Sequence, residues 1–252
     1  MDKLTLLEYV QRVLSALESD EVNSIADTSE ADLVATLAQD VYYNIITRRT
    51  WPFLQRTLTL ESINDLTRPT ILKIGETVTR IDDFRYNITG GTNPTSNVNT
   101  YRPITYLEPQ SFLDKVLAYD NQSSNVLATS TLTGERFYVY TDQPPNYWTS
   151  FDDEYIVCDA YDSSLEQTLQ QTNSYAYGEV YPDWTVDDDF VPDLPVHMIS
   201  LYLNELKSEA FVNIKQAPNQ KTEQNARRSW VRTQKNEWRQ DGKPNQPNFG
   251  RS

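Results

Sequence analysis

The spacing of apolar residues changes twice along this chain of 252 residues. Near both ends, apolar residues recur every three or four positions, which is the period of one helix face. Between these ends they alternate with polar residues, which is the period of a half-buried strand. A segment cannot satisfy both periods at once. The sequence therefore predicts an α+β fold, in which N- and C-terminal helices form a bundle with a β-rich lobe inserted between them and an extended C-terminal arm after it.

Two helices are predicted before the lobe. Thr5 and Glu8 have the spacing of a capping box, and the helix that follows carries Leu6, Val10, Val13, Leu14 and Leu17 on one face. The second helix is predicted from Ser29 to Arg48, because Ser29 and Asp32 resemble an N-terminus and Trp51-Pro52 stops it. Its apolar stripe consists of Leu33, Leu37, Val41 and Ile45. Two such helices joined by one loop are expected to pack antiparallel. A third helix is then needed to cover their apolar faces.

The third helix is predicted over Leu194–Ile214. Asp193 is a candidate N-cap, Pro195 suits the first turn, and the stripe is Val196, Ile199, Leu203, Leu206 and Ala210. Pro218 then breaks or kinks the helix. We expect this helix to pack on the two N-terminal ones and to bury Leu14, Leu37, Val41, Leu203 and Leu206.

The central segment contains strand patterns separated by turns and loops. Strands are predicted over 57–63, 70–74, 77–81, 125–129, 136–141 and 155–160, with a turn near Thr133-Gly134, a short helix over 109–119 and an extended segment at SYAYGEVY (174–181). The predicted organisation is a discontinuous helical bundle (1–53 and 190–217), a β-rich inserted lobe (54–189), and a basic helix with a C-terminal docking arm (218–252).

Charge is distributed unevenly. The chain has a net charge of −14. From Ser200 to Ser252 there are ten Lys/Arg against five Asp/Glu, so this segment carries +5 and the rest −19. An acidic body with a basic end predicts different partners for the two parts.

The basic helix after Pro218 has only a thin apolar stripe of Ala226, Trp230 and Trp238. Such a helix is expected to find no place within its own domain and to bind a neighbour, with Trp as anchors and Arg around them. Two other interpretations remain open: phosphate binding, and a solvated helix with a frayed end. The spacing of eight between the two Trp residues favours a helix lying in a protein groove. The predicted docking residues are Arg227, Arg228, Trp230, Arg232, Trp238, Arg239 and Phe249.

Residue types favoured in catalysis are scarce. The chain has one histidine, His197, and one cysteine, Cys158, which we interpret as a packing or capping residue and a core strand residue. No Gly-x-Ser-x-Gly, GxGxxG or P-loop pattern occurs. The acidic runs Asp152–Glu154 and Asp187–Asp189 lack EF-hand spacing and are interpreted as solvated loops. We therefore expect no catalytic, metal or cofactor site, and the absence of a long apolar run predicts no membrane span.

Five stretches carry a likeness to a known family. They are DEVNSIADTSEA (Asp20–Ala31), DVYYNIITRRTWPF (Asp40–Phe53), PPNYWTSFDDEYIVCDAYDSSLEQTLQQT (Pro144–Thr172), DFVPDLPVHMI (Asp189–Ile199) and KSEAFVNIKQAPNQKTEQNARRSWVRTQKNEWR (Lys207–Arg239). The chain resembles the head-to-tail adaptors (neck or tail tubular protein A-like proteins) of short-tailed bacteriophages over nearly its full length, most weakly across 57–130. The resemblance implies a dodecameric ring in the virion, with the portal protein above, a tail nozzle or tail tube protein below, and genomic DNA passing through.

The expected function is thus a non-enzymatic virion structural protein, assembled in the host cytoplasm, that joins the capsid portal to the tail. The alternative is a nucleic-acid-binding accessory virion protein that uses its basic C-terminal helix. If DNA passes through a ring, acidic side chains facing the channel would keep it from sticking. Candidates for that role are Asp20, Glu21, Asp152–Glu154 and Asp187–Asp189.

Overall fold

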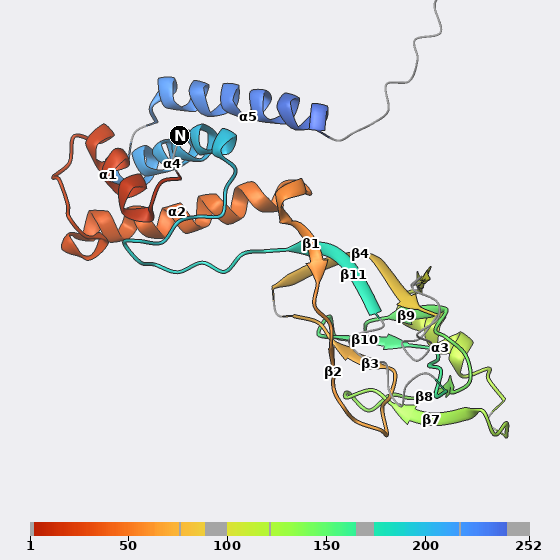
Figure 1. The fold of residues 1–252 in the computed structure, drawn as a ribbon. Helices are drawn as coiled ribbons and strands as arrows, with labels where there is room; N and C mark the ends of the chain where they lie inside the picture. Colours follow the sequence, from red (N-terminus) through yellow and green to blue (C-terminus); the bar gives the residue numbers. More distant parts are fainter. Residues whose placement is uncertain are drawn as a thin grey trace, which may run out of the picture. The chain divides into compact units, whose positions relative to one another are not determined.

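A computed structural model describes residues 3–75, 77–88, 100–120, 122–164, 174–216 and 218–240, the last six by their backbone alone. The chain divides into two compact units (Figure 1), Met1–Phe53 with Pro182–Ser252 and Leu54–Tyr181. We call them the helical unit and the β-rich unit. The described residues contain both helices and strands, as the change of apolar period predicts. No described helix is both long and apolar enough to cross a bilayer.

Helix α1 (Leu6–Ala16) begins with the predicted capping box. The Thr5 hydroxyl accepts a hydrogen bond from the Glu8 backbone N–H, and the Glu8 carboxylate accepts one from the Thr5 N–H. The buried face consists of Leu6, Tyr9, Val10, Val13 and Leu14. The helix ends before Glu18, whose φ of 56° turns the chain out of the helical path.

Helix α2 (Ser29–Thr47) starts at Ser29 as predicted, and its N-cap is the preceding residue, Thr28. The short 3₁₀ helix η1 (Ile25–Asp27) precedes it, with its own capping box from Ser24. The predicted apolar stripe of α2 is partly wrong, since Leu33 is 40% exposed and Leu37 only half-buried. The buried face is rotated toward Ala31, Val34, Ala35, Ala38, Val41, Tyr42, Ile45 and Ile46.

Residues 182–189 belong to the helical unit, which corrects the predicted lobe boundary at 189. The reason is a set of contacts with the N-terminal helices. The Leu7 N–H donates to the Asp188 carbonyl at 3.3 Å, and the Asp188 carboxylate accepts from the Ile25 N–H at 2.8 Å. Trp184 packs against Tyr42 with ring centroids 5.1 Å apart. The segment thus caps α1 and η1 instead of extending the lobe.

Helix α4 (Ile199–Lys215) starts later than predicted, after the 3₁₀ helix η3 (Val196–Met198). Asp193 does not cap it and forms a salt bridge with Lys3 at 3.2 Å. Leu206 and Ala210 are buried as expected, whereas Leu203 is half-buried and Val196 is 43% exposed.

The Tyr202 ring of α4 lies at the centre of the helical unit. It contacts Tyr9 of α1 at 4.9 Å and Tyr42 of α2 at 6.4 Å, both edge-to-face, and its hydroxyl donates to the Ala38 carbonyl at 2.8 Å. One tyrosine therefore ties three helices together, because edge-to-face pairs are favourable and the buried hydroxyl has an acceptor.

The β-rich unit contains two main sheets. One has the order β1 (Gln55–Leu58), β11 (Ser174–Val180), β4 (Val78–Asn87), β5 (Tyr101–Pro103). The other has the order β2 (Glu61–Ser62), β3 (Ile71–Lys73), β10 (Tyr155–Cys158), β9 (Tyr147–Thr149), β6 (Thr105–Tyr106). Strands β6 and β9 are parallel and the other pairs antiparallel. The 3₁₀ helix η2 (Pro52–Leu54) precedes β1.

A hairpin of β7 (Val126–Ser130) and β8 (Arg136–Tyr140) completes the unit together with helix α3 (Pro109–Val116). The predicted turn at Gly134 is confirmed, since this residue has a φ of 102°. One buried cluster includes Leu72, Phe84, Trp148, Ile156 and Cys158, and a second joins Phe112 of α3 to Phe137 and Val139 of β8. Strands β5, β6 and β9, each of two or three residues, are absent from the sequence prediction.

The pairing of β4 with β11 is irregular beside Gly178. The register shifts between Tyr177 and Gly178 and again between Glu179 and Val180. A Cβ atom on Gly178 would lie 2.0 Å from the Arg80 carbonyl oxygen, a distance that no side chain tolerates. Glycine is required here because the two backbones approach too closely for any side chain.

Candidate docking surface

Helix α5 (Gln220–Gln240) starts directly after a tight reversal of the chain. Gln216, at the end of α4, has a φ of 53°, which terminates that helix in the left-handed region. The Asn219 side-chain oxygen then accepts hydrogen bonds from the backbone N–H groups of Lys221 at 3.1 Å and Thr222 at 3.3 Å. This cap fixes where α5 begins and directs it back along α4, which it contacts (Figure 1).

The face of α5 that meets α4 is formed by small and polar side chains. Ala226 and Thr233 are each only 4% exposed. The Asn204 side-chain amide of α4 donates to the Ser229 hydroxyl at 3.2 Å. The prediction that this helix finds no place in its own domain is therefore wrong. Small side chains let two helices approach closely, so a thin apolar stripe is enough for packing.

Trp230 lies in an aromatic stack with the end of α2. Its ring centroid is 6.2 Å from that of Trp51, and the Arg48 guanidinium lies 4.7 Å from the Trp230 ring. The Arg49 guanidinium lies 4.6 Å from the centroid of the Trp51 ring. Trp51 is fully buried and donates its indole N–H to the Ile45 carbonyl at 3.0 Å. The stack anchors α5, since Arg and Trp attract through cation–π contacts.

This contact corrects one predicted docking residue. Trp230 was expected to face a partner, but it lies against its own unit and is only half-exposed. The sequence analysis missed the aromatic contacts of Arg48 and Arg49. The available signal was the adjacency of two Arg to a Trp in Arg48-Arg49-Thr50-Trp51.

The opposite face of α5 is basic. Arg227, Arg228 and Arg232 are exposed, and Val231 between them is 52% exposed. At 3.6 residues per turn these four positions span about 140° of the helix, on the side away from Ala226 and Thr233. The structure therefore brings together three of the predicted docking residues. The side chains of Trp238 and Arg239, and all of Phe249, lie outside the described part of the chain.

This basic face suits a partner that carries carboxylates. Guanidinium groups form paired hydrogen bonds with carboxylate oxygens, and the exposed Val231 at the centre supplies an apolar contact. A row of three arginines held on an anchored helix is more rigid than the same charges on a flexible tail. Such rigidity lowers the entropy lost on binding.

The acidic runs have local structural roles in addition to their charge. An Asp152 carboxylate oxygen accepts the backbone N–H groups of Glu154 and Tyr155, both at 3.1 Å. Asp187 likewise accepts the Asp189 N–H at 3.1 Å, while Asp188 caps η1. Among the described residues, no three His, Cys, Asp or Glu side chains are grouped so as to hold a metal ion.

The single histidine and the single cysteine lie in different environments. His197 is exposed in η3. Cys158 is fully buried in β10, as predicted for a core strand residue, and burial raises the pKa of its thiol well above the usual value. The neighbouring Asp159 adds to that shift. A thiol held in its neutral form is a poor nucleophile.

No protein-family model matches this sequence, and no curated protein matches it either.

Proposed function

We propose that this chain is a non-enzymatic structural protein of a bacteriophage virion, a head-to-tail adaptor that joins the capsid portal to the tail. In this proposal the helical unit, the inserted lobe and the C-terminal arm build one subunit of a ring around the DNA path. The resemblance of five long stretches to such adaptors supports the family. The exposed arginine face of α5 is the structural observation that carries the docking role.

The portal, or a neighbouring subunit, is the proposed partner of that face. Arg227, Arg228 and Arg232 would meet its carboxylates, and Val231 would fill the centre of the contact. Trp230 contributes indirectly by holding the helix in place through Trp51 and Arg48. Trp238, Arg239 and Phe249 remain predicted to extend the contact toward the C-terminus.

The experiment is attachment of the purified protein to portal-bearing heads. We expect Arg228→Glu/Arg232→Glu to abolish attachment, because charge reversal turns attraction to carboxylates into repulsion. The matched control is Arg136→Glu/Lys215→Glu, which changes net charge equally at two exposed positions outside α5. Unchanged attachment of the α5 variant would contradict the docking face. Failure of the wild-type protein to attach would contradict the adaptor function.

The alternative function, nucleic-acid binding, is favoured by the same exposed arginines, since Arg also binds phosphates. Against it stands the charge of the whole chain, −14. The net negative charge of the chain repels a polyanion that approaches α5. It repels the single negative charge of a protein carboxylate much less.

A further inference from the structure

Strand β7 lies at an edge of the β-rich unit and pairs with one neighbour. In the described part of the chain, its sheet consists of β7 and β8 alone. The two strands pair in a regular register, with Leu127 opposite Val139 and Thr129 opposite Phe137. The edge of β7 that faces away from β8 is therefore not covered by any described strand, and we call it the open edge.

The hydrogen bonds at the two ends of the hairpin show which residues of β7 bond to β8. The Thr131 N–H donates to the Glu135 carbonyl, and the Thr141 N–H donates to the Asn125 carbonyl, both at 2.9 Å. In an antiparallel pair, residues that bond to the partner strand alternate with residues whose N–H and C=O groups point away from it. Positions 125, 127, 129 and 131 are thus the bonded ones.

Ala128 and Ser130 consequently direct their backbone N–H and C=O groups to the open edge. The same alternation holds on β8, where Tyr140 lies opposite Val126 and donates its N–H away from β7, to the Asp159 carbonyl at 3.2 Å. Among the described residues, none bonds to the backbone groups of Ala128 or Ser130 at the open edge. The open edge therefore presents donors and acceptors at the spacing of a strand.

The open edge also lacks the features that usually keep a foreign strand away. Edge strands are commonly protected by charged side chains, proline, bulges or short length. The other edge strands of this unit follow that rule: β1 contains Arg56, β2 contains Glu61, β5 ends at Pro103 and β6 has two residues. Residues 122–134 contain neither a charged residue nor a proline, although 23% of the chain is charged. The pairing of β7 with β8 has no register shift that would mark a bulge.

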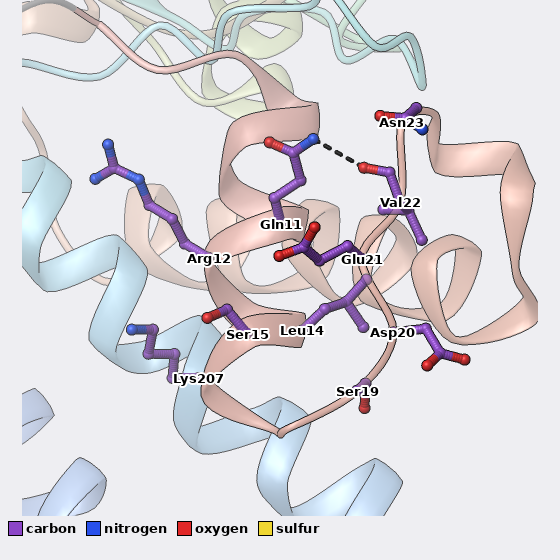
Figure 2. A pocket seen from close by; sticks show the side chains of 10 residues that line it. All are labelled: Gln11, Arg12, Leu14, Ser15, Ser19, Asp20, Glu21, Val22, Asn23 and Lys207. Carbon is purple, nitrogen blue, oxygen red and sulfur yellow. Dashed lines mark hydrogen bonds between the residues drawn. The ribbon is translucent and has the colours of Figure 1, made fainter.

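The cavity of the helical unit is a less specific surface. It has a volume of about 570 Å³ and lies between α1, the loop that follows it, and α4 (Figure 2). The Gln11 side-chain amide donates to the Val22 carbonyl at 2.9 Å and holds the loop beside α1. Its charged lining residues are two cations and two carboxylates, namely Arg12, Lys207, Asp20 and Glu21. These charges cancel, so the cavity favours neither an anion nor a cation.

We propose that the open edge of β7 binds an extended, uncharged segment of another protein, which adds to the hairpin as a third strand. The backbone of that segment bonds to the outward N–H and C=O groups of Ala128 and Ser130. The segment is uncharged because a charged side chain beside residues 122–134 would lose water without gaining an opposite charge.

The choice of another protein over a second copy rests on the proposed function. Two copies that pair β7 with β7 are related by a two-fold axis, and such a contact uses up the edge of both. A ring needs head-to-tail contacts between its subunits instead. The open edge itself does not depend on the adaptor function.

Hydrogen exchange of the full chain, resolved by residue with NMR, tests whether the edge is open. We expect the amides of Ala128 and Ser130 to exchange at least about tenfold faster than those of Leu127 and Thr129, which bond to β8. Equal protection of all four amides would overturn the proposal, because the edge would then already be covered.

Binding is measured by fluorescence anisotropy with a labelled, uncharged peptide of alternating Thr and Val, six residues long. We expect a dissociation constant below about 1 mM, and slower exchange of the Ala128 and Ser130 amides when the peptide is bound. The same peptide methylated at every backbone nitrogen has no N–H donors and should not bind. Absence of binding by the unmodified peptide at about 1 mM, or equal binding by the methylated one, would overturn the proposal.

Ala128→Pro removes one outward N–H that the pairing with β8 does not use. We expect this variant to raise the dissociation constant of the peptide about tenfold. The matched control is Ala128→Thr, which keeps the N–H and should bind like the wild type. Retained protection of the Leu127 and Thr129 amides shows that the hairpin of a variant is intact. Ala128→Lys, which keeps the N–H and adds a charge, should also weaken binding. Wild-type affinity in both the proline and the lysine variants would contradict the proposal.

Sedimentation velocity of the wild-type protein and of Ala128→Pro tests the other occupant. Dimers that form in the wild type and are lost in the proline variant would show that a second copy covers the edge, and would overturn the proposed partner. Failure of this inference is distinguishable from failure of the adaptor function. Peptide binding without attachment to portal-bearing heads leaves the edge site standing and refutes the adaptor. Attachment without peptide binding does the reverse.

Discussion

Asp159 is a buried carboxylate with three donors around it. It is 1% exposed, and one of its oxygens accepts the N–H groups of Asn146 and Tyr147, both at 2.9 Å. The Tyr119 hydroxyl donates to the other oxygen at 3.1 Å. Burial raises the pKa of Asp159, and these three hydrogen bonds offset part of that rise. The residue thereby links α3 and its following loop to strand β9.

Asp159→Asn should make the β-rich unit less sensitive to pH. Because the folded-state pKa of Asp159 is raised, the folded chain binds this proton more tightly than the unfolded chain. Its contribution to stability is full below the unfolded pKa of about 3.9 and is lost as pH rises through the folded value. The free energy of unfolding of the variant, relative to wild type, should therefore increase as the pH rises above about 4.

Urea unfolding at several pH values measures this difference. Asp153→Asn, which removes an exposed carboxylate of the same unit, is the control for the loss of one negative charge. A difference that is constant or decreases with pH would contradict the role assigned to Asp159. The asparagine side chain is nearly the same shape, and its oxygen can still accept both backbone N–H groups. Its NH2 group replaces the oxygen that accepts from Tyr119, so the Tyr119 hydroxyl has to accept that hydrogen bond instead of donating it.

At the scale of elements, α5 depends on a contact far away in the sequence. The helix is rich in Arg, Gln and Asn, and only Ala226 and Thr233 are nearly fully buried among its described side chains. Its position is therefore determined by the Trp230–Trp51 pair together with the Asn204–Ser229 hydrogen bond. An element that buries so few side chains opens more easily than the helices around Tyr202.

Trp230→Ala should release α5 while α1 and α2 stay folded. The side chain is half-exposed, so the loss of stability should be about 1–3 kcal/mol, below the value typical of a fully buried Trp. Hydrogen exchange of the isolated protein should show protection across 226–233 in the wild type and its loss in the variant. Val231→Ala, one residue further and 52% exposed, should leave protection unchanged. An unprotected α5 in the wild-type protein would contradict its packing against α4 and Trp51.

At the scale of the whole molecule, the net charge of −14 is the dominant electrostatic property. Exposed carboxylates at Asp20, Glu21, Asp153 and Glu154 contribute to it without any ion pair among the described residues. A negatively charged surface repels DNA at distances up to the Debye length, which is about 8 Å at 0.15 M salt. A protein around a DNA path would thereby let the duplex slide.

The isolated protein should accordingly show little affinity for duplex DNA at about 0.15 M salt. A gel-shift titration at that ionic strength tests this expectation, and repeating it at lower salt shows whether the arginines of α5 bind phosphates at all. Tight binding at the higher salt, lost in Arg228→Glu/Arg232→Glu, would favour the nucleic-acid-binding alternative over the adaptor.

Features that depend on neighbouring residues can be predicted from the amino-acid sequence alone. The capping box of Thr5 and Glu8, helix α3, the turn at Gly134 and the extended segment that becomes β11 all follow from local spacing or backbone preference. The separation of a basic C-terminal segment from an acidic body is likewise read directly from the residues. For the candidate site, this was enough to identify Arg227, Arg228 and Arg232, because their exposure follows from their charge.

Features that depend on residues distant in the sequence follow from the packing of the folded chain. Helix α2 offers two adjacent apolar stripes, and packing against Tyr202 selects the one with Val34 and Ala38 over the one with Leu33. Strands β5, β6 and β9 are too short for a periodic signal and exist because a neighbouring strand supplies their hydrogen bonds. Trp230 has the composition of a docking anchor, but Trp51, about 180 residues away, is its partner in the fold. Spacing along a chain cannot identify such a partner, because the contact depends on how the helices pack in three dimensions.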